Sequence, residues 1–415
     1  MKNLNKTIIV MIALIIFCKA SISSQVNPKE PKLNKQALLK TWKKTVVPEF
    51  EKVAKAYPKA GLSICLIQDG KVSDMRTKGY RDKARKLPNT PETIVNWGSI
   101  TKTFTAIAIM QLRDRGKLKL GDPVVKYIPE VRWIRTDSIG VDVEEITIKH
   151  LLTHTSGITL TDRKWHYYDD FNDLAHRPIK WEQISAILPY IKVKRRPGVK
   201  HVYSNFAFVL LGRVIENIER EAYTAYIYKN ILMPLEMNTA HFGTSPPHLK
   251  YRKSLSYHKK DKDSTHVVFN MDIHNYGVGN PTGGLCASIE DMTKYTKFLA
   301  GTTNRKLQLK YDLVLKPSTL DEMFTCKHQI LSRKDFKYCI GLGMFLYEYK
   351  KKPLNTHSGA QYGFISYLYF SREQKAGAFI IFNTRDEDIT IKEARLGETT
   401  ISMRHFLGWV PKKKK

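Results

Sequence analysis

The sequence predicts a mixed α/β (α+β) protein in which an antiparallel sheet is flanked by helices and joined to a mainly helical second lobe. Two apolar-rich runs within residues 61–79 flank Asp69-Gly70, a dipeptide that suits a tight turn, so they indicate a β-hairpin. A second pair of such runs lies at 363–370 and 378–383, and the long section between the two pairs is mainly helical. Strands from both ends of the chain therefore predict one sheet that is built from distant segments. Such a fold has two lobes, and the seam between them is a usual place for a ligand pocket.

Length and composition are consistent with a globular protein that has a large core. The chain has 415 residues, of which 42% are hydrophobic, and no internal repeat interrupts it. Its net charge is +30, which favours anionic partners such as cell-envelope polymers; a lysine-rich solvated surface is the simpler interpretation. We find no zinc-finger, RNA-binding or basic-zipper pattern, so we expect no nucleic-acid partner.

The first residues have the layout of a secretory signal, with a basic start, about a dozen apolar residues and then small residues. We assign residues 1–23 to the signal peptide, 24–40 to a polar tether, 41–411 to the folded domain and 412–415 to a basic tail. This layout predicts a secreted or periplasmic protein with no stable membrane span after processing. The alternatives are an uncleaved membrane anchor and a lipoprotein attached at Cys18, but Cys18 lacks the small neighbours that lipoprotein attachment requires.

Four cysteines remain after removal of the signal: Cys65, Cys286, Cys326 and Cys339. Export would permit disulfides, and Cys326 with Cys339 could close a short excursion in a hairpin. The sequence does not fix this pairing, and buried free thiols are the alternative.

The middle of the chain has apolar residues at helical spacing in five stretches: 101–115, 146–153, 181–192, 205–218 and 289–300. Residues 391–409 predict a terminal helix that packs on the sheet. The basic segment 244–280 either covers a cleft or forms a surface loop.

The sequence GSITK (98–102) places Ser99 three residues before Lys102, at the start of a stretch that is apolar around most of a helix. Burial lowers the pKa of a lysine, and the start of a helix stabilises a developing negative charge. Ser99 and Lys102 could therefore be a nucleophile and its base. A capping serine followed by an ordinary lysine is the alternative for this motif alone.

Two further motifs favour the catalytic interpretation. Tyr203 and Asn205 stand immediately before an apolar helix, and His357, Ser358 and Gly359 precede the second hairpin. The order S-x-x-K, Y-x-N, H-S-G resembles the serine β-lactamase and penicillin-binding-protein superfamily, most closely its class C branch with its D,D-carboxypeptidases, D-amino-acid amidases and esterases. The resemblance covers about residues 45–410 and includes ITIKHLLTHTSGI and PTGGLCASIEDMTKY.

This resemblance implies a β-lactamase/transpeptidase-like fold with its active site at the seam, and a serine hydrolase that needs no cofactor. Ser99 would form the acyl-enzyme, while Lys102 and Tyr203 would form the proton network. Asn205 would orient Lys102 or bind the substrate. The backbone N–H groups of Ser99 and Ala360 would form the oxyanion hole.

His357, Ser358 and Gly359 would bind the substrate, Gly359 by keeping the strand edge open. β-Lactamases usually have lysine at the position of His357, and histidine with a pKa near 6.5 is a weaker anion ligand at neutral pH. We expect His357 to titrate within about a unit of 6.5, so that if it contacts a substrate carboxylate as a cation, binding should weaken as the pH rises through this pKa. Peptide, amide or ester hydrolysis is thus the first hypothesis. The alternatives are a class C-like β-lactamase and a non-catalytic envelope-binding protein with a basic surface.

Two other patterns do not indicate a cofactor. His150 and His154 are one helical turn apart, but no glutamate follows the first histidine as in a zinc protease, so we expect no metal site. Gly283-Gly284 lacks the context of a phosphate loop, and the residues after it read as a capping box that starts a helix at Ser288.

Overall fold

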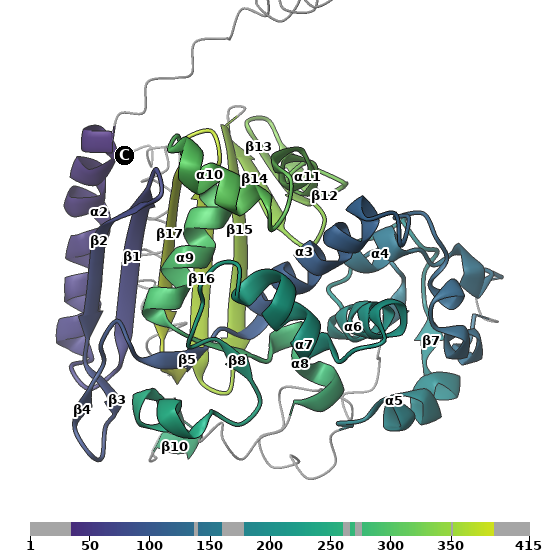
Figure 1. The fold of residues 1–415 in the computed structure, drawn as a ribbon, viewed down its shortest axis with the longest axis horizontal. Helices are drawn as coiled ribbons and strands as arrows, with labels where there is room; N and C mark the ends of the chain where they lie inside the picture. Colours follow the sequence, from purple (N-terminus) through teal and green to yellow (C-terminus); the bar gives the residue numbers. More distant parts are fainter. Residues whose placement is uncertain are drawn as a thin grey trace, which may run out of the picture. The chain divides into compact units, whose positions relative to one another are not determined.

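The computed structural model describes residues 35–136, 140–159, 178–259, 266–269, 276–349 and 352–385, and its main feature is an antiparallel sheet. Within these residues the sheet has eight strands in the order β12-β13-β14-β15-β16-β17-β1-β2 (Figure 1). Their bounds are β1 Leu62–Gln68, β2 Lys71–Lys78, β12 His328–Arg333, β13 Phe336–Ile340, β14 Phe345–Tyr349, β15 Lys352–Gln361, β16 Phe364–Ser371 and β17 Ala376–Phe382.

The sheet joins the two ends of the described chain, as the sequence predicts. β1 and β2 form the first hairpin, and Asp69 and Gly70 at its turn have φ angles of 48° and 75°. β16 and β17 form the second hairpin, and β17 pairs with β1 so that Ile64 lies opposite Ile380. Every residue of β1 and β17 is buried, which explains their nearly continuous apolar sequence.

Strands β12–β14 were only partly anticipated, as a hairpin near the cysteines. The residues of β12 and β13 are mostly half-buried or exposed, so these strands lack a long apolar run and their signal in the sequence is weak. Of the two alternatives for the cysteines, a disulfide joins Cys326 and Cys339, whereas Cys65 and Cys286 are buried free thiols.

Helices cover both faces of the sheet. α2 (Lys35–Ala56) packs its buried residues, including Trp42 and Phe50, on one face, and α9 (Ile289–Ala300) lies across the other. Residues 35–40, which we assigned to the polar tether, are the first residues of α2, and Leu38 and Leu39 pack partly against the core. The tether assignment extended too far because these two leucines stand among lysines.

The remaining helices gather beside β15 and form the second lobe (Figure 1). They are α3 Thr101–Asp114, α4 Ile148–Leu152, α5 Trp181–Ile187, α6 Asn205–Glu219, α7 Tyr223–Ile227 and α8 Asn280–Gly283. α10 (Arg305–Asp312) lies next to the β1–β2 turn, where its Leu307 is close to Gly70, and α11 (Pro317–Met323) lies beside β12 and β13. The five helices expected from apolar spacing are thus found, although α5 is shorter because residues 188–190 continue as a 3-10 turn.

Among the described residues, short strands form four small sheets. Their bounds are β3 Tyr80–Asp82, β4 Leu87–Pro88, β5 Ile94–Asn96, β6 Ile158–Thr159, β7 Lys192–Val193, β8 His241–Phe242, β9 Ser256–Lys259, β10 His266–Phe269, β11 Leu285–Ser288 and β18 Thr384–Arg385. The predicted signal peptide, terminal helix and basic tail lie outside the described residues. In the part of the chain that is described, no helix has the length and apolar character needed to cross a membrane.

Candidate active site

The Ser99 turn connects β5 to α3 through a 3-10 turn at Gly98–Ile100. Gly98 has a φ of 54°, a conformation that glycine adopts without strain, and its N–H donates to the Asn96 side chain. Ser99 is half-buried at the start of the helix, and its Oγ lies 3.0 Å from Lys102 Nζ. The structure therefore brings the two residues of the S-x-x-K motif into direct contact.

Lys102 is fully buried, as the apolar sequence around it predicts. Its Nζ donates to the Thr282 carbonyl oxygen at 2.6 Å, and no carboxylate among the described residues pairs with it. Burial holds the pKa of Lys102 well below its ordinary value. The lowered pKa makes the neutral amine more accessible, and in that form its lone pair can take the Ser99 hydroxyl proton.

Thr282 belongs to α8 and was not identified as a site residue from the sequence. It contributes a backbone carbonyl, which any amino acid at this position would supply, so its side chain gave no signal. The segment PTGGLCASIEDMTKY was noted only as part of the family resemblance.

Tyr203 lies beside this pair, since Lys102 Nζ is 5.1 Å from the centre of its ring. Its side chain is 41% exposed, so it can reach both the buried amine and a molecule in solvent. Ser204, the next residue, caps α6 by accepting from the Ala207 N–H, and this cap fixes where the loop that carries Tyr203 ends.

Asn205 is the first residue of α6 and is half-buried. Among the described residues its Oδ1 has no hydrogen-bond partner, and the group that orients Lys102 is the Thr282 carbonyl. The expected contact between Asn205 and Lys102 is therefore absent from this structure. A role of Asn205 in substrate binding stays a prediction.

β15 forms the opposite side of the site. Its residues 352–356 pair with β14, whereas residues 357–361 pair only with β16 among the described strands. The second half of β15 thus has one edge without a neighbouring strand, and the Ser99 turn lies against this part of the strand. Burial alternates along this half of the strand: His357 and Gly359 are buried, and Ser358 and Ala360 are exposed.

Gly359 permits this close approach. A Cβ atom at Gly359 would lie 2.1 Å from the Trp97 carbonyl oxygen and 3.1 Å from the Ser99 nitrogen. We expected Gly359 to keep the strand edge open to substrate; the structure shows that it also lets the nucleophile turn contact the strand. The Ser99 and Ala360 backbones are thereby neighbours, and their assignment to the oxyanion hole stays a prediction.

His357 differs from the expectation. Its Nδ1 lies 2.7 Å from the Ser358 carbonyl oxygen, to which it donates when it carries the hydrogen. Burial, and then the positive charge of Lys102, lower the pKa of His357 to about 3. The expected titration within about a unit of pH 6.5 is therefore wrong, because the sequence gave no measure of how deeply the ring is buried. Contact of His357 with a substrate carboxylate stays a prediction.

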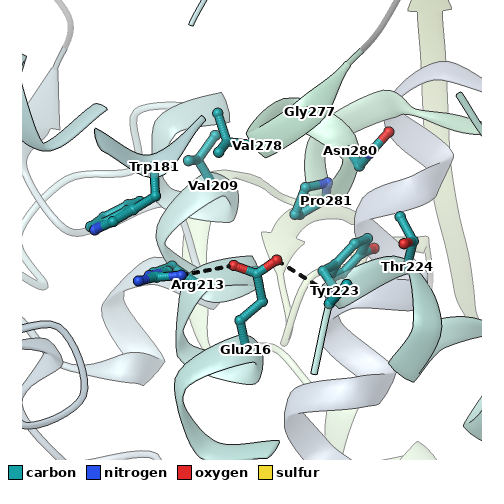
Figure 2. A pocket seen from close by; sticks show the side chains of 12 residues that line it. Trp181, Val209, Arg213, Glu216, Tyr223, Thr224, Gly277, Val278, Asn280 and Pro281 are labelled. Atoms are coloured by element: carbon teal, nitrogen blue, oxygen red, sulfur yellow. Dashed lines mark hydrogen bonds and ion pairs between the residues drawn. The ribbon is translucent and has the colours of Figure 1, made fainter. Parts of the chain in front are cut away.

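A cavity of about 200 Å³ lies between α5, α6, α7 and α8, next to this site (Figure 2). Arg213 and Glu216, an ion pair on α6, lie along one side of it, and Pro281 of α8 lies across from them. None of the site residues predicted from the sequence lines it. Two of the helices around the cavity also carry site residues: α6 begins with Asn205, and α8 contains Thr282.

The comparisons with known proteins are consistent with this geometry. Residues 50–398 match the family model described as Beta-lactamase. Protein flp of Staphylococcus aureus (strain NCTC 8325 / PS 47) is 28% identical over 331 residues, which are 79% of this chain but 60% of that relative, so the chain spans about 60% of its length. The teichoic acid D-alanine hydrolase of Staphylococcus aureus is 29% identical over 66% of this chain and 68% of its own.

A solved structure is also similar. The octameric penicillin-binding protein homologue from Pyrococcus abyssi has a TM-score of 0.72 and 27% identity, covering 89% of this chain and 78% of that one. This likeness confirms the β-lactamase/transpeptidase-like fold, and the family model covers most of the chain. The chain belongs to the beta-lactamase family.

Proposed function

We propose that this protein is a serine hydrolase that cleaves amide or ester bonds through an acyl-enzyme at Ser99. One observation carries the proposal: the Ser99 Oγ lies 3.0 Å from the amine of Lys102, which is fully buried and paired with no carboxylate among the described residues. A serine hydroxyl needs a nearby base to become a nucleophile, and a neutral lysine is one.

The reaction follows from this contact. The proton of the Ser99 hydroxyl passes to Lys102 Nζ while Oγ forms a bond to the substrate carbonyl carbon. The bond from that carbon to the leaving group then breaks, and the leaving oxygen or nitrogen takes a proton from Lys102 or through Tyr203. Water attacks the acyl carbon in the second half, releases the acid and restores the hydroxyl.

The chemistry around His357 supports substrates without a carboxylate over β-lactams. A buried imidazole whose pKa is about 3 carries no charge near neutral pH, so it offers no cation for the carboxylate of a β-lactam. We therefore favour esters or amides of D-amino acids, the class named for the teichoic acid D-alanine hydrolase. β-Lactam turnover is the alternative that the substrate comparison tests.

A fluorophosphonate probe tests the nucleophile. It should label Ser99 covalently, as shown by peptide mass mapping, and Ser99→Ala should lose labelling and turnover while keeping the thermal unfolding transition. Ser358, an exposed serine on the facing strand, should stay unlabelled in the same experiment. Labelling at Ser358 or at any other serine would contradict the assignment.

Parallel turnover measurements test the substrate class. A short acyl ester, a D-alanyl ester, a D-Ala-D-Ala peptide and a chromogenic cephalosporin are compared at equal enzyme concentration. We expect the esters to have the highest kcat/KM. A cephalosporin turned over faster than all the others would establish the β-lactamase alternative instead.

We further propose that the protein is exported to the cell envelope. The layout of residues 1–23 and the disulfide between Cys326 and Cys339 support an oxidising compartment, and the charge of +30 suits anionic envelope polymers. N-terminal sequencing of the mature protein should find a start between residues 19 and 26. An intact Met1 on a cytoplasmic form would contradict export.

A further inference from the structure

His154 makes hydrogen bonds to the two residues that stand on either side of Tyr203 in the sequence. The Val202 N–H donates to the His154 carbonyl oxygen at 2.8 Å, and the Ser204 N–H donates to His154 Nδ1 at 3.1 Å. The residues immediately before and after Tyr203 are thus both attached to the same residue, which comes from the turn after α4.

The His154 ring also lies against the tyrosine itself. The two ring centres are 4.5 Å apart with a tilt of 34°, and Lys102 Nζ lies 5.1 Å from the centre of the Tyr203 ring. His154 is 1% exposed and has a φ of 54°, so its position is fixed by burial and by a left-handed backbone. Backbone and side chain of His154 therefore both set the place of Tyr203.

We propose that His154 is a positioning residue for acyl transfer, which holds Tyr203 beside Lys102 through its Nδ1 acceptor. The inference rests on the proposed function, because it assigns Tyr203 to the proton network. His154 itself does not touch the reacting atoms in this account.

A purely structural role explains the contacts less well. α6 already has its own cap in the Ser204 side chain, so the start of the helix does not need His154. Because Nδ1 accepts a hydrogen bond, Nε2 carries the hydrogen, and it is buried without a partner among the described residues. An unpaired buried donor costs free energy, and a leucine of similar size would avoid this cost but could not accept from Ser204.

Two substitutions separate the hydrogen bond from the backbone conformation. His154→Asn keeps an acceptor oxygen at the position of Nδ1 and tolerates a positive φ, whereas His154→Gly tolerates the same φ and lacks the acceptor. We expect His154→Gly to lower the acylation rate constant of Ser99 by roughly 100-fold, since a shift of about 1 Å has this effect, and to leave probe binding nearly unchanged. His154→Asn should recover most of the rate.

The control is His150→Asn, because His150 is one turn earlier, half-buried, and bonds with Glu145 and Thr147 instead. All variants are compared by thermal unfolding, and the rates are measured at a temperature at which the glycine variant is folded. Equal rates for His154→Gly and wild type would overturn the inference, as would equal losses in the Asn and Gly variants. In a Tyr203→Phe background, His154→Gly should add no further loss, and a full additional loss would also overturn it.

These outcomes are distinct from failure of the proposed function. If the wild-type protein is not labelled at Ser99, the hydrolase proposal fails before the His154 variants are measured. If the wild type is labelled and the variants behave like it, only the role of His154 is wrong.

Discussion

Substitution of Gly359 by alanine tests the packing of the nucleophile turn on β15. The added Cβ would lie 2.1 Å from the Trp97 carbonyl oxygen and 2.5 Å from Ser366 Oγ, whereas ordinary contacts are 3.4 Å or longer. Neither the strand backbone nor the Trp97 carbonyl is a flexible side chain, so the turn and the strand must separate by about 1 Å. This separation also increases the distance between the Ser99 and Ala360 backbones.

The expected loss is large for activity and moderate for stability. A displacement of about 1 Å at the reacting groups costs roughly 100-fold in rate. Overpacking in a buried site costs about 1–3 kcal/mol in the free energy of unfolding. The acylation rate constant measured with the fluorophosphonate probe should therefore fall far more than the stability alone would explain.

Gly121→Ala is the matched control, because no atom lies within 4 Å of a Cβ at Gly121. It makes the same chemical change at an exposed turn and should leave both the rate and the unfolding transition unaltered. The reasoning is refuted if Gly359→Ala acylates at the wild-type rate, or if its loss of rate equals the unfolded fraction.

Three further predictions concern Lys102, His357 and the disulfide. Lys102→Met should unfold at a higher temperature than wild type, because a buried amine is replaced by an apolar side chain, while the acylation rate falls roughly 100- to 10,000-fold. The folded-state pKa of His357 is about 3, below its unfolded value of 6.5, so its contribution to stability is present above pH 6.5 and is lost as the pH falls towards 3. Urea unfolding across this range should show wild type losing up to about 1.4 kcal/mol per pH unit more than His357→Gln, and parallel curves would contradict the burial of the ring. Replacing Cys326 and Cys339 by serine should lower the free energy of unfolding by about 3 kcal/mol, and an unchanged value would mean that the bond is absent from the protein in solution.

The sequence determined the elements whose signals are local. Asp69-Gly70 between two apolar runs predicted the first hairpin because the turn and its strands are adjacent in the chain. Apolar spacing predicted α3 and α6, whose buried faces are continuous over several turns. The same locality explains why Ser99 and Lys102, three residues apart on one helix face, could be paired from the sequence alone.

The tertiary structure decided what depends on segments that are distant in the chain. Lys102 is oriented by the carbonyl of Thr282, 180 residues away, and a backbone group leaves no trace in residue identity. Only the approach of Trp97 to Gly359 shows why a glycine is required there.

Electrostatic character belongs to this second group as well. The sequence showed that position 357 is a histidine, but its charge depends on how completely the surrounding chain excludes water, and burial lowers its pKa to about 3. Similarly, the sequence showed His154 only as one of two histidines a helical turn apart. Its hydrogen bonds to the residues on both sides of Tyr203 form because the turn after α4 folds against the start of α6. Sequence therefore specified which groups are present, and the fold determined which of them are neutral, buried and in contact.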